Sequence, residues 1–270
     1  LRLLPNFRKK RTKNNHGAHL AFLPWRCHPI QLGADYCCDS AHKMLSGLTG
    51  TAYLHVRSDI DVEPERVRDA MAMFGSTSPS YLMLASLDWC NRELASPLFR
   101  KQLEEVLDRI QQLKCRFSPR YCFVDGDPMH LTIDAAAGGF HGLELAAYLE
   151  QHEVFVEYAD AFHVVLLCSA ANTDRDFDIL EQLLERFSPT PAESGEKYAL
   201  PRPEKVCGIR EAALAPQEIV PIGESSGRIC AAVKVPCPPA VPIVLSGERI
   251  DARCIAVCEA YGITEISVVQ

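Results

Sequence analysis

The sequence predicts an α/β fold, because segments with the period of helices and segments with the period of strands follow one another along the chain. The clearest helical stripe runs from Pro97 to about Lys114, where apolar residues recur every three or four positions. Between residues 120 and 190, short β-branched runs alternate with helical segments. This alternation is typical of a sheet covered by helices.

The first part of the chain is expected to carry two short strands and three helices. Residues 32–38 and 51–56 read as strands on either side of a turn of small residues. Helices are expected near Pro64, near Ser78-Pro79 and from Pro97 onward. Their apolar stripes predict core packing: Val67, Ala70, Met71 and Phe74; Leu82, Ala85 and Trp89; Leu103, Val106, Leu107, Ile110 and Leu113.

Residues 120–190 predict a small α+β domain with a sheet covered on one face. The capping residues Asn172-Thr173 mark the start of its last helix. The expected elements are a strand at Leu131–Ile133, a helix at His141–Gln151, strands at Val154–Tyr158 and His163–Cys168, and a helix from Asp174 to Phe187.

Composition is that of an ordinary globular protein. The chain has 270 residues, of which 47% are hydrophobic and 23% charged. No apolar run reaches the roughly 18–20 residues that a membrane span needs, so we expect a soluble protein without a membrane partner. The net charge of −7 argues against nonspecific nucleic-acid binding.

The first fifteen residues differ from the rest, because they hold several basic residues and no acidic one. This segment could be an arm that binds polyanions, an organelle-targeting peptide or a stretch without a folded role. Pro5 and the dense Lys/Arg run give it no amphipathic period, so we expect residues 1–15 to be disordered.

Twelve cysteines raise the possibility of a zinc or redox-thiol protein. Their spacing does not favour it, because Cys37 and Cys38 are adjacent and no Cys-x-x-Cys pair occurs. We therefore expect reduced, mostly buried cysteines, a cytoplasmic location and no metal.

Lys43 is the residue with the most specific chemistry. It lies in Asp39-Ser40-Ala41-His42-Lys43, among small and apolar residues. A lysine that loses hydration there would have a lowered pKa and a nucleophilic amine, as Schiff-base chemistry with an aldehyde cofactor requires.

Several blocks around and after Lys43 resemble the Orn/Lys/Arg decarboxylases, in the order of that family. The blocks, between about His16 and the end of the chain, are His16–Leu20, Leu32–Asp35, Asp39–Lys43, Ala52–His55, Ser76–Tyr81 with Leu84–Asp88, Glu157–Asp160, Pro221–Ile229, Pro236–Pro242 and Gly247-Glu248.

The resemblance implies a lyase of fold type I that uses pyridoxal 5'-phosphate to decarboxylate arginine, lysine or ornithine to the amine, a step toward polyamines. It makes Lys43 the Schiff-base lysine and a catalytic residue. Ser40 and His42 would contact the cofactor phosphate, and His16 would stack on the pyridine ring as a second catalytic residue.

Further site residues follow from the resemblance, each with an alternative. Ser76 and Thr77 could bind the cofactor phosphate of a neighbouring subunit or simply cap a helix. Arg228 could pair with a substrate carboxylate or be structural. Glu224 or Asp160 could bind the distal cationic group of the substrate or be a solvated acid, and His42 could be an ordinary half-buried histidine.

One departure from the family lies before His16. Lys13-Asn14-Asn15 stands where the family has acidic residues, one of which pairs with the pyridine nitrogen. A lysine there would disfavour the pyridinium form. The alternative to an active enzyme is therefore a catalytically impaired fragment or a non-catalytic partner subunit.

The resemblance also suggests a domain plan and an assembly. We expect a partial aminotransferase-like large domain over 16–115, the small α+β domain over 116–190, a linker over 191–204 and a C-terminal decarboxylase domain over 205–270. This plan corresponds to the C-terminal portion of a family member, without the N-terminal half of the large domain. The partners implied are a small basic amino acid and a second copy in a homodimer.

Overall fold

The computed structural model describes residues 15–18, 28–191, 200–232 and 242–270. They divide into two compact units, which are described separately. The first comprises residues up to Asp134 together with 145–157 and 165–188. The second comprises 135–144, 158–164 and 189–270. The domain boundaries expected from the sequence stay predictions. Disorder was expected for residues 1–15, of which 1–14 lie outside the described residues, whereas Asn15 belongs to a strand.

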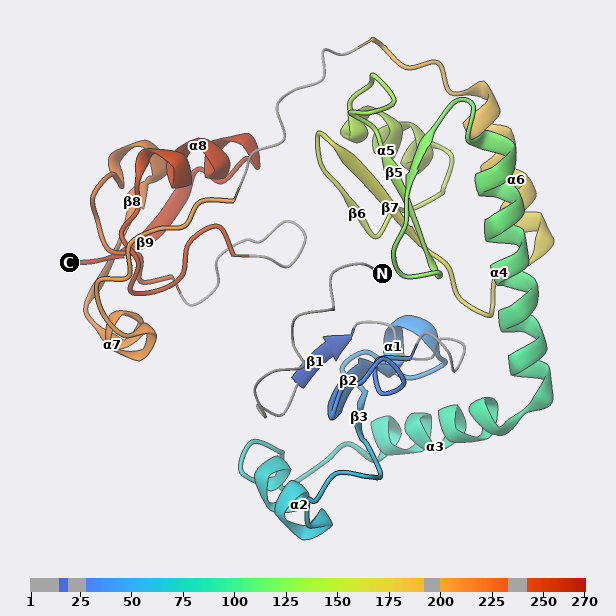
Figure 1. Ribbon diagram of the computed structural model, residues 1–270, viewed down its shortest axis with the longest axis horizontal. Helices are drawn as coiled ribbons and strands as arrows, with labels where there is room; N and C mark the ends of the chain where they lie inside the picture. The colour runs from blue at the N-terminus through green and yellow to red at the C-terminus, as the bar shows by residue number, and fades with distance from the viewer. Residues whose placement is uncertain (1–14, 19–27, 192–199, 233–241) are drawn as a thin grey trace. The chain divides into compact units, whose positions relative to one another are not determined.

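A three-stranded sheet carries the lysine segment (Figure 1). Strand β2 (Tyr36–Ser40) lies between β1 (Asn15–Ala18), which is parallel to it, and β3 (Ala52–Val56), which is antiparallel. The short helix α1 (Ala41–Met44) follows β2 directly. The expected strand at 51–56 is thus confirmed.

The strand expected at 32–38 begins only at Tyr36, which corrects the sequence-based boundary. Residues 28–33 form a turn, in which the Ala34 amide donates to the Pro29 carbonyl and Gly33 has a φ of +103°. A positive φ is a turn conformation that glycine adopts without steric cost, so the chain turns here before it extends.

Three helices follow, as expected. They are α2 (Pro64–Ala72), α3 (Tyr81–Ala95) and α4 (Pro97–Phe117). Prolines near the first turns of α2 and α4 suit those positions, because the first amides of a helix have no intrahelical partner.

The apolar stripes of these three helices were predicted to pack in the core. That prediction is confirmed for α4 and wrong for α2 and α3. In α4 the stripe is buried, with Leu107 partly so. Helix α2 buries no residue and α3 buries only Cys90. Leu82 is 75% exposed, Trp89 61% and Phe74 91%, because no described segment covers these faces.

A four-stranded sheet has the order β4-β5-β7-β6, with α5 and α6 beside it (Figure 1). The strands are β4 (Cys122–Val124), β5 (His130–Asp134), β6 (Tyr158–Ala159) and β7 (His163–Leu167), and the helices are α5 (Gly142–Gln151) and α6 (Asp174–Arg186). Helix α6 packs against α4. These elements confirm the α+β pattern expected for this region.

The strand expected at Val154–Tyr158 is wrong for its first four residues. Only Tyr158 and Ala159 pair as a strand. Phe155 is 73% exposed, whereas Val154 and Val156 are partly buried. Sequence alone cannot tell whether such a short apolar run forms a paired strand or an irregular segment, since its period is compatible with either.

The last part of the chain forms a two-stranded sheet with short helices. Strands β8 (Gln217–Pro221) and β9 (Glu265–Val269) are antiparallel. Around them lie α7 (Ile209–Leu214), η3 (Ile222–Glu224) and α8 (Ala252–Ala260). Its core includes Ile243, Ile250 and Val268.

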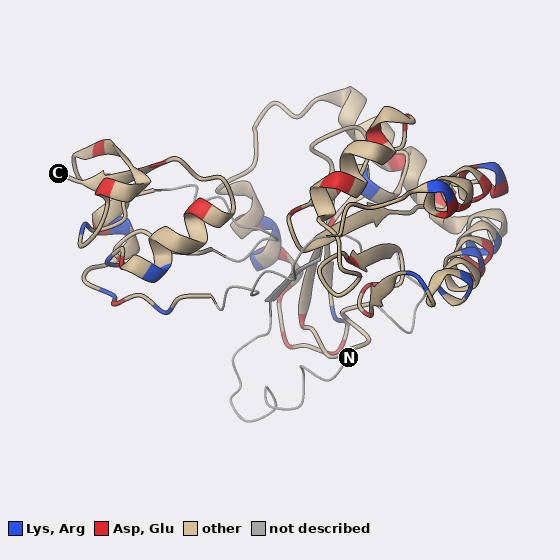
Figure 2. Cartoon of the chain, turned by 90° about the horizontal axis from the view of Figure 1, so that it is seen from above, with Lys and Arg blue, Asp and Glu red and all other residues tan. Residues whose placement is uncertain are grey.

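Charged side chains of both signs are interspersed over the described residues (Figure 2). Among those residues, no helix is both long and apolar enough to cross a bilayer.

Candidate functional site

Lys43 lies in the single turn of helix that follows the central strand β2. Its Nζ donates a hydrogen bond to Glu157 Oε1 at 2.5 Å. Both side chains are partly exposed, Lys43 by 27% and Glu157 by 36%. The amine is therefore accessible and held by a carboxylate, rather than surrounded by apolar groups as its sequence context suggested.

Thr51, the residue before β3, forms hydrogen bonds with the lysine helix and with the turn that follows it. The Thr51 carbonyl accepts from the Ala41 amide at 3.1 Å and contacts His42 Nδ1 at 3.1 Å. The Thr51 hydroxyl donates to Leu48 O at 2.7 Å. A Cβ at Gly47 would lie 2.6 Å from Thr51 Oγ1, so only glycine fits here without displacing the threonine.

The contact to Thr51 determines which ring nitrogen of His42 carries a proton, and therefore whether the ring can donate to the cofactor phosphate. A carbonyl can only accept, so Nδ1 carries a proton. In the neutral ring Nε2 is then an acceptor, and it donates to a phosphate only when the imidazole carries both protons. Ser40 ends β2 and is partly buried beside this turn. Together Ser40, His42 and Lys43 form one continuous segment, as the sequence motif requires.

His16 lies in β1, where its Cα is registered with that of Cys37. The described structure therefore brings the His16 backbone to the strand next to the lysine segment. Lys13, which stands where the family has an acid, lies outside the described residues. The roles expected for these two positions stay predictions.

Ser76 and Thr77 lie in an exposed loop between α2 and α3. Ser76 Oγ accepts from the Ser78 amide at 3.1 Å. The cap of α3 is Ser80, so neither residue caps this helix. Their expected contact with a neighbouring subunit stays a prediction.

Three residues are expected to bind the substrate: Asp160, Arg228 and Glu224. The first two have structural partners, and Glu224 is exposed. Asp160 is 7% exposed and accepts hydrogen bonds from the Phe162 amide, the His163 amide and the Tyr158 hydroxyl at 2.7–2.8 Å. Burial raises the pKa of Tyr158, and its hydrogen bond to Asp160 raises it further.

Arg228 also has partners within its own unit, where it donates to Glu218 Oε1 and to the Val269 carbonyl. Glu224 is exposed in η3. Asp160, Glu224 and Arg228 all belong to the second unit, whereas Lys43 belongs to the first. Their substrate roles stay predictions.

Glu157 is the site residue that sequence reasoning missed. It is 114 positions away from Lys43 in sequence. The signal in the sequence is the block Glu157-Tyr158-Ala159-Asp160, which holds both acids and does not distinguish them. In the fold Asp160 accepts backbone hydrogen bonds within a turn, whereas Glu157 contacts the lysine.

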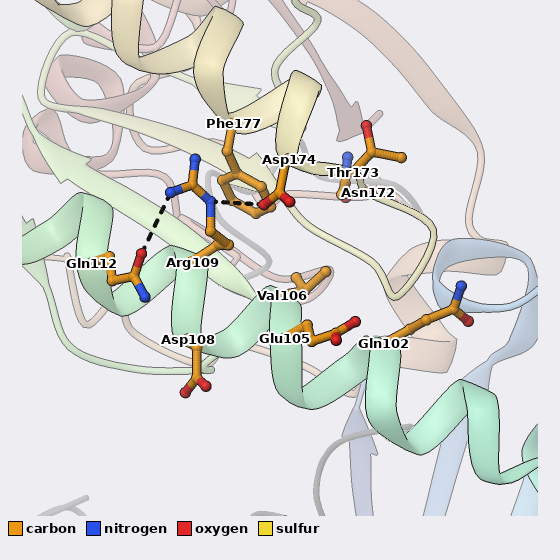
Figure 3. Close-up of a pocket in the computed structure, with 10 residues that line it drawn as sticks. All are labelled: Gln102, Glu105, Val106, Asp108, Arg109, Gln112, Asn172, Thr173, Asp174 and Phe177. Carbon is orange, nitrogen blue, oxygen red and sulfur yellow. Dashed lines mark hydrogen bonds and ion pairs between the residues drawn. The ribbon is translucent and has the colours of Figure 1, made fainter.

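A separate pocket lies between α4 and α6 (Figure 3). Arg109 reaches across it to Asp174 at 3.2 Å and lies 3.4 Å from Gln112 Oε1. None of the predicted site residues lines it. Arg109 and Asp174 pair with each other across it, which is typical of a packed helix interface rather than a substrate site.

Comparison with known families decides what the lysine segment belongs to. The model of the Orn/Lys/Arg decarboxylase major domain matches residues 11–127, and that of the Orn/Lys/Arg decarboxylase C-terminal domain matches residues 204–260. The two matches occur in the order expected from the sequence. The chain belongs to the Orn/Lys/Arg decarboxylase family.

Curated relatives agree with this assignment. An arginine decarboxylase of Halalkalibacterium halodurans is 30% identical over 263 residues, and one of Bacillus subtilis is 30% identical over 264. Each alignment covers 89% of this chain and 53% of the relative. The chain thus spans about half the length of the curated relatives it matches.

Solved structures show the same fold. The constitutive lysine decarboxylase of E. coli matches with a TM-score of 0.69 and 15% identity, covering 95% of this chain and 54% of that one. Lysine decarboxylase A from Pseudomonas aeruginosa matches with a TM-score of 0.70 and 17% identity, covering 95% and 53%. The chain therefore has part of the fold type I decarboxylase architecture, as the resemblance implied.

Proposed function

We propose that this chain takes part in the pyridoxal-phosphate-dependent decarboxylation of a basic amino acid, with Lys43 as the residue that binds the cofactor aldehyde. The observation that carries the proposal is the placement of Lys43. Its amine lies within the matched major-domain segment, partly exposed, at the end of the strand that holds Ser40 and next to His42.

The described residues fit the cofactor at its aldehyde and phosphate ends. Lys43 offers a reachable amine, Ser40 a hydroxyl donor, and His42 a ring whose orientation is fixed by Thr51. When bound, the cofactor supplies the electron sink that accepts the charge left at Cα after loss of carbon dioxide.

Glu157 has two roles in this proposal. In the cofactor-free chain it neutralises the Lys43 ammonium at 2.5 Å. With the cofactor held at Lys43, Glu157 would offer its carboxylate to a cationic group of the substrate, which arginine, lysine and ornithine all carry.

The first experiment tests cofactor binding. Purified chain is incubated with pyridoxal phosphate, reduced with borohydride and digested, and the pyridoxyl group is located by mass spectrometry. We expect the adduct on Lys43 and its loss in Lys43→Ala. Lys101→Ala is the matched control, because Lys101 also faces a glutamate, Glu105, at 3.4 Å but on the exposed face of α4.

The second experiment tests turnover and the alternative function, a non-catalytic partner subunit. Release of carbon dioxide is measured with arginine, lysine and ornithine, each compared with Lys43→Ala. Glu157→Gln is expected to keep the adduct on Lys43 and to raise KM more than it lowers kcat, since binding of a cation is lost. An adduct without turnover would favour the partner-subunit function, and an adduct elsewhere or nowhere in folded protein would contradict both.

A further inference from the structure

A cluster of two histidines and one aspartate lies beneath the lysine segment. Asp39 is in β2, His55 is in β3, and His28 is in the turn that precedes β2. His55 Nε2 is 2.9 Å from Asp39 Oδ2, and His28 Nε2 is 3.7 Å from the same oxygen. One ligand atom from each of the three lies within 4.8 Å of the other two.

We propose that His28, Asp39 and His55 form a binding site for a divalent transition metal ion, with Zn²⁺ as the expected ion. Two imidazoles and a carboxylate are a ligand set that zinc accepts, with a fourth position left for water. Bonds of roughly 2.0–2.2 Å put tetrahedral ligands roughly 3.4 Å apart. The distances from Asp39 Oδ2 to His55 Nε2 (2.9 Å) and to His28 Nε2 (3.7 Å) lie on either side of this value, so small side-chain adjustments suffice.

The burial of Asp39 is a second, independent reason for the proposal. Its side chain is fully buried, and within the described residues its Oδ2 accepts no hydrogen bond of good geometry, although two imidazoles lie beside it. A buried carboxylate oxygen in this state is costly. A cation between Asp39, His28 and His55 would satisfy it by coordination.

The other oxygen of Asp39 is already oriented for this role. Cys37 Sγ donates to Asp39 Oδ1 at 2.7 Å, and Cys37 is registered opposite His55 in the ladder. A hydrogen bond to a ligating carboxylate from outside the coordination sphere fixes its direction. Cys37 would therefore support the site without being a ligand.

His28 can bind metal after one local rearrangement. The Ile30 amide donates to His28 Nδ1 at 3.1 Å. Coordination through Nε2 leaves the ring proton on Nδ1, so this contact within one turn must open when the ion binds.

The ion would join the turn at residues 28–33, β2 and β3 immediately before the lysine helix. Its expected effect is to stabilise this sheet, because an ion that binds only the folded state stabilises it by mass action. The site is independent of pyridoxal phosphate, and its test uses no cofactor and no activity.

The test is titration of the full chain, freed of metal by a chelator, with Co²⁺. We expect one equivalent to bind with visible d–d bands and without a thiolate charge-transfer band, and Zn²⁺ to displace it. The absence of that band distinguishes this site from the exposed Cys38, Cys115 and Cys122, which could bind metal adventitiously. Zn²⁺ should also raise the thermal unfolding midpoint.

The variants are His28→Gln and His55→Gln, with His152→Gln as control, since His152 is exposed and outside the cluster. Each cluster variant should lower Co²⁺ affinity at least about tenfold and remove the Zn²⁺ shift of the midpoint. The control should change neither. Three results would overturn the proposal. They are the absence of stoichiometric Co²⁺ binding, the presence of a thiolate band, and an unchanged Co²⁺ affinity in His28→Gln and His55→Gln whose folding has been checked by circular dichroism.

Discussion

Helices α3 and α4 follow one another with only Ser96 between them, and both carry an apolar stripe, yet one stripe is buried and the other is not. In α4 six apolar residues from Phe99 to Phe117 are buried. In α3 only Cys90 is buried, while Tyr81, Leu82 and Trp89 are more than half exposed. The same local pattern thus gives opposite environments.

The difference lies in the neighbours. Helix α4 packs along α6, and Arg109 and Arg116 bridge to acidic residues of α6 beside the apolar contact. The stripe of α3 has no comparable cover among the described residues. Exposed apolar side chains on one helix are a feature of contact surfaces, so the exposure of the α3 stripe can be tested in solution.

The largest effect expected from this comparison concerns stability. Leu113→Ala in α4 should lower the free energy of unfolding by about 2–5 kcal/mol, because Leu113 is fully buried and the change leaves a cavity. Leu82→Ala in α3 should change it by less than about 0.5 kcal/mol. Urea denaturation measures both. Equal losses would mean that the α3 face is covered in solution.

A smaller effect is expected from the cap of α6, the helix that covers α4. Asp176 accepts from the Thr173 amide at 2.8 Å, and this bond holds the pKa of the Asp176 carboxyl below its usual value. Asp176→Ala should cost about 0.5–1 kcal/mol at pH 7.

The pH dependence of this effect has a definite sign. A carboxyl with a lowered folded-state pKa stabilises the fold above its unfolded-state value of about 3.8, and the contribution disappears as the pH falls through the folded-state value. The difference between Asp176→Ala and the parent should therefore shrink in urea titrations between pH 5 and about pH 3. Glu104→Ala, an exposed change in α4, is the control and should show little difference at either pH.

The smallest effect on stability is expected at Trp89. Trp25→Phe leaves Trp89 as the only tryptophan, and its 61% exposure predicts red-shifted emission and strong acrylamide quenching. Trp89→Phe should change the free energy of unfolding by less than about 0.5 kcal/mol. Protection of Trp89 that falls on dilution would instead show that a second copy covers α3.

Much of the fold could be predicted because it is encoded locally. Apolar period, Pro64, Pro97 and the Asn172-Thr173 cap placed the helices within a few residues. The segment Ser40–Lys43 could be found because its residues are adjacent in sequence, and the family followed from ordered blocks of such segments.

The rest depended on contacts between residues far apart in sequence. Nothing local distinguishes Glu157 from Asp160, or the stripe of α3 from that of α4, because burial and pairing are decided by what packs opposite. His28, Asp39 and His55 have no motif spacing and meet only when a turn and two strands fold together. By itself the sequence determined most of the elements and the family, and it singled out Lys43 as the candidate cofactor lysine. The tertiary structure decided which carboxylate meets the lysine and which faces are covered, since those depend on long-range packing.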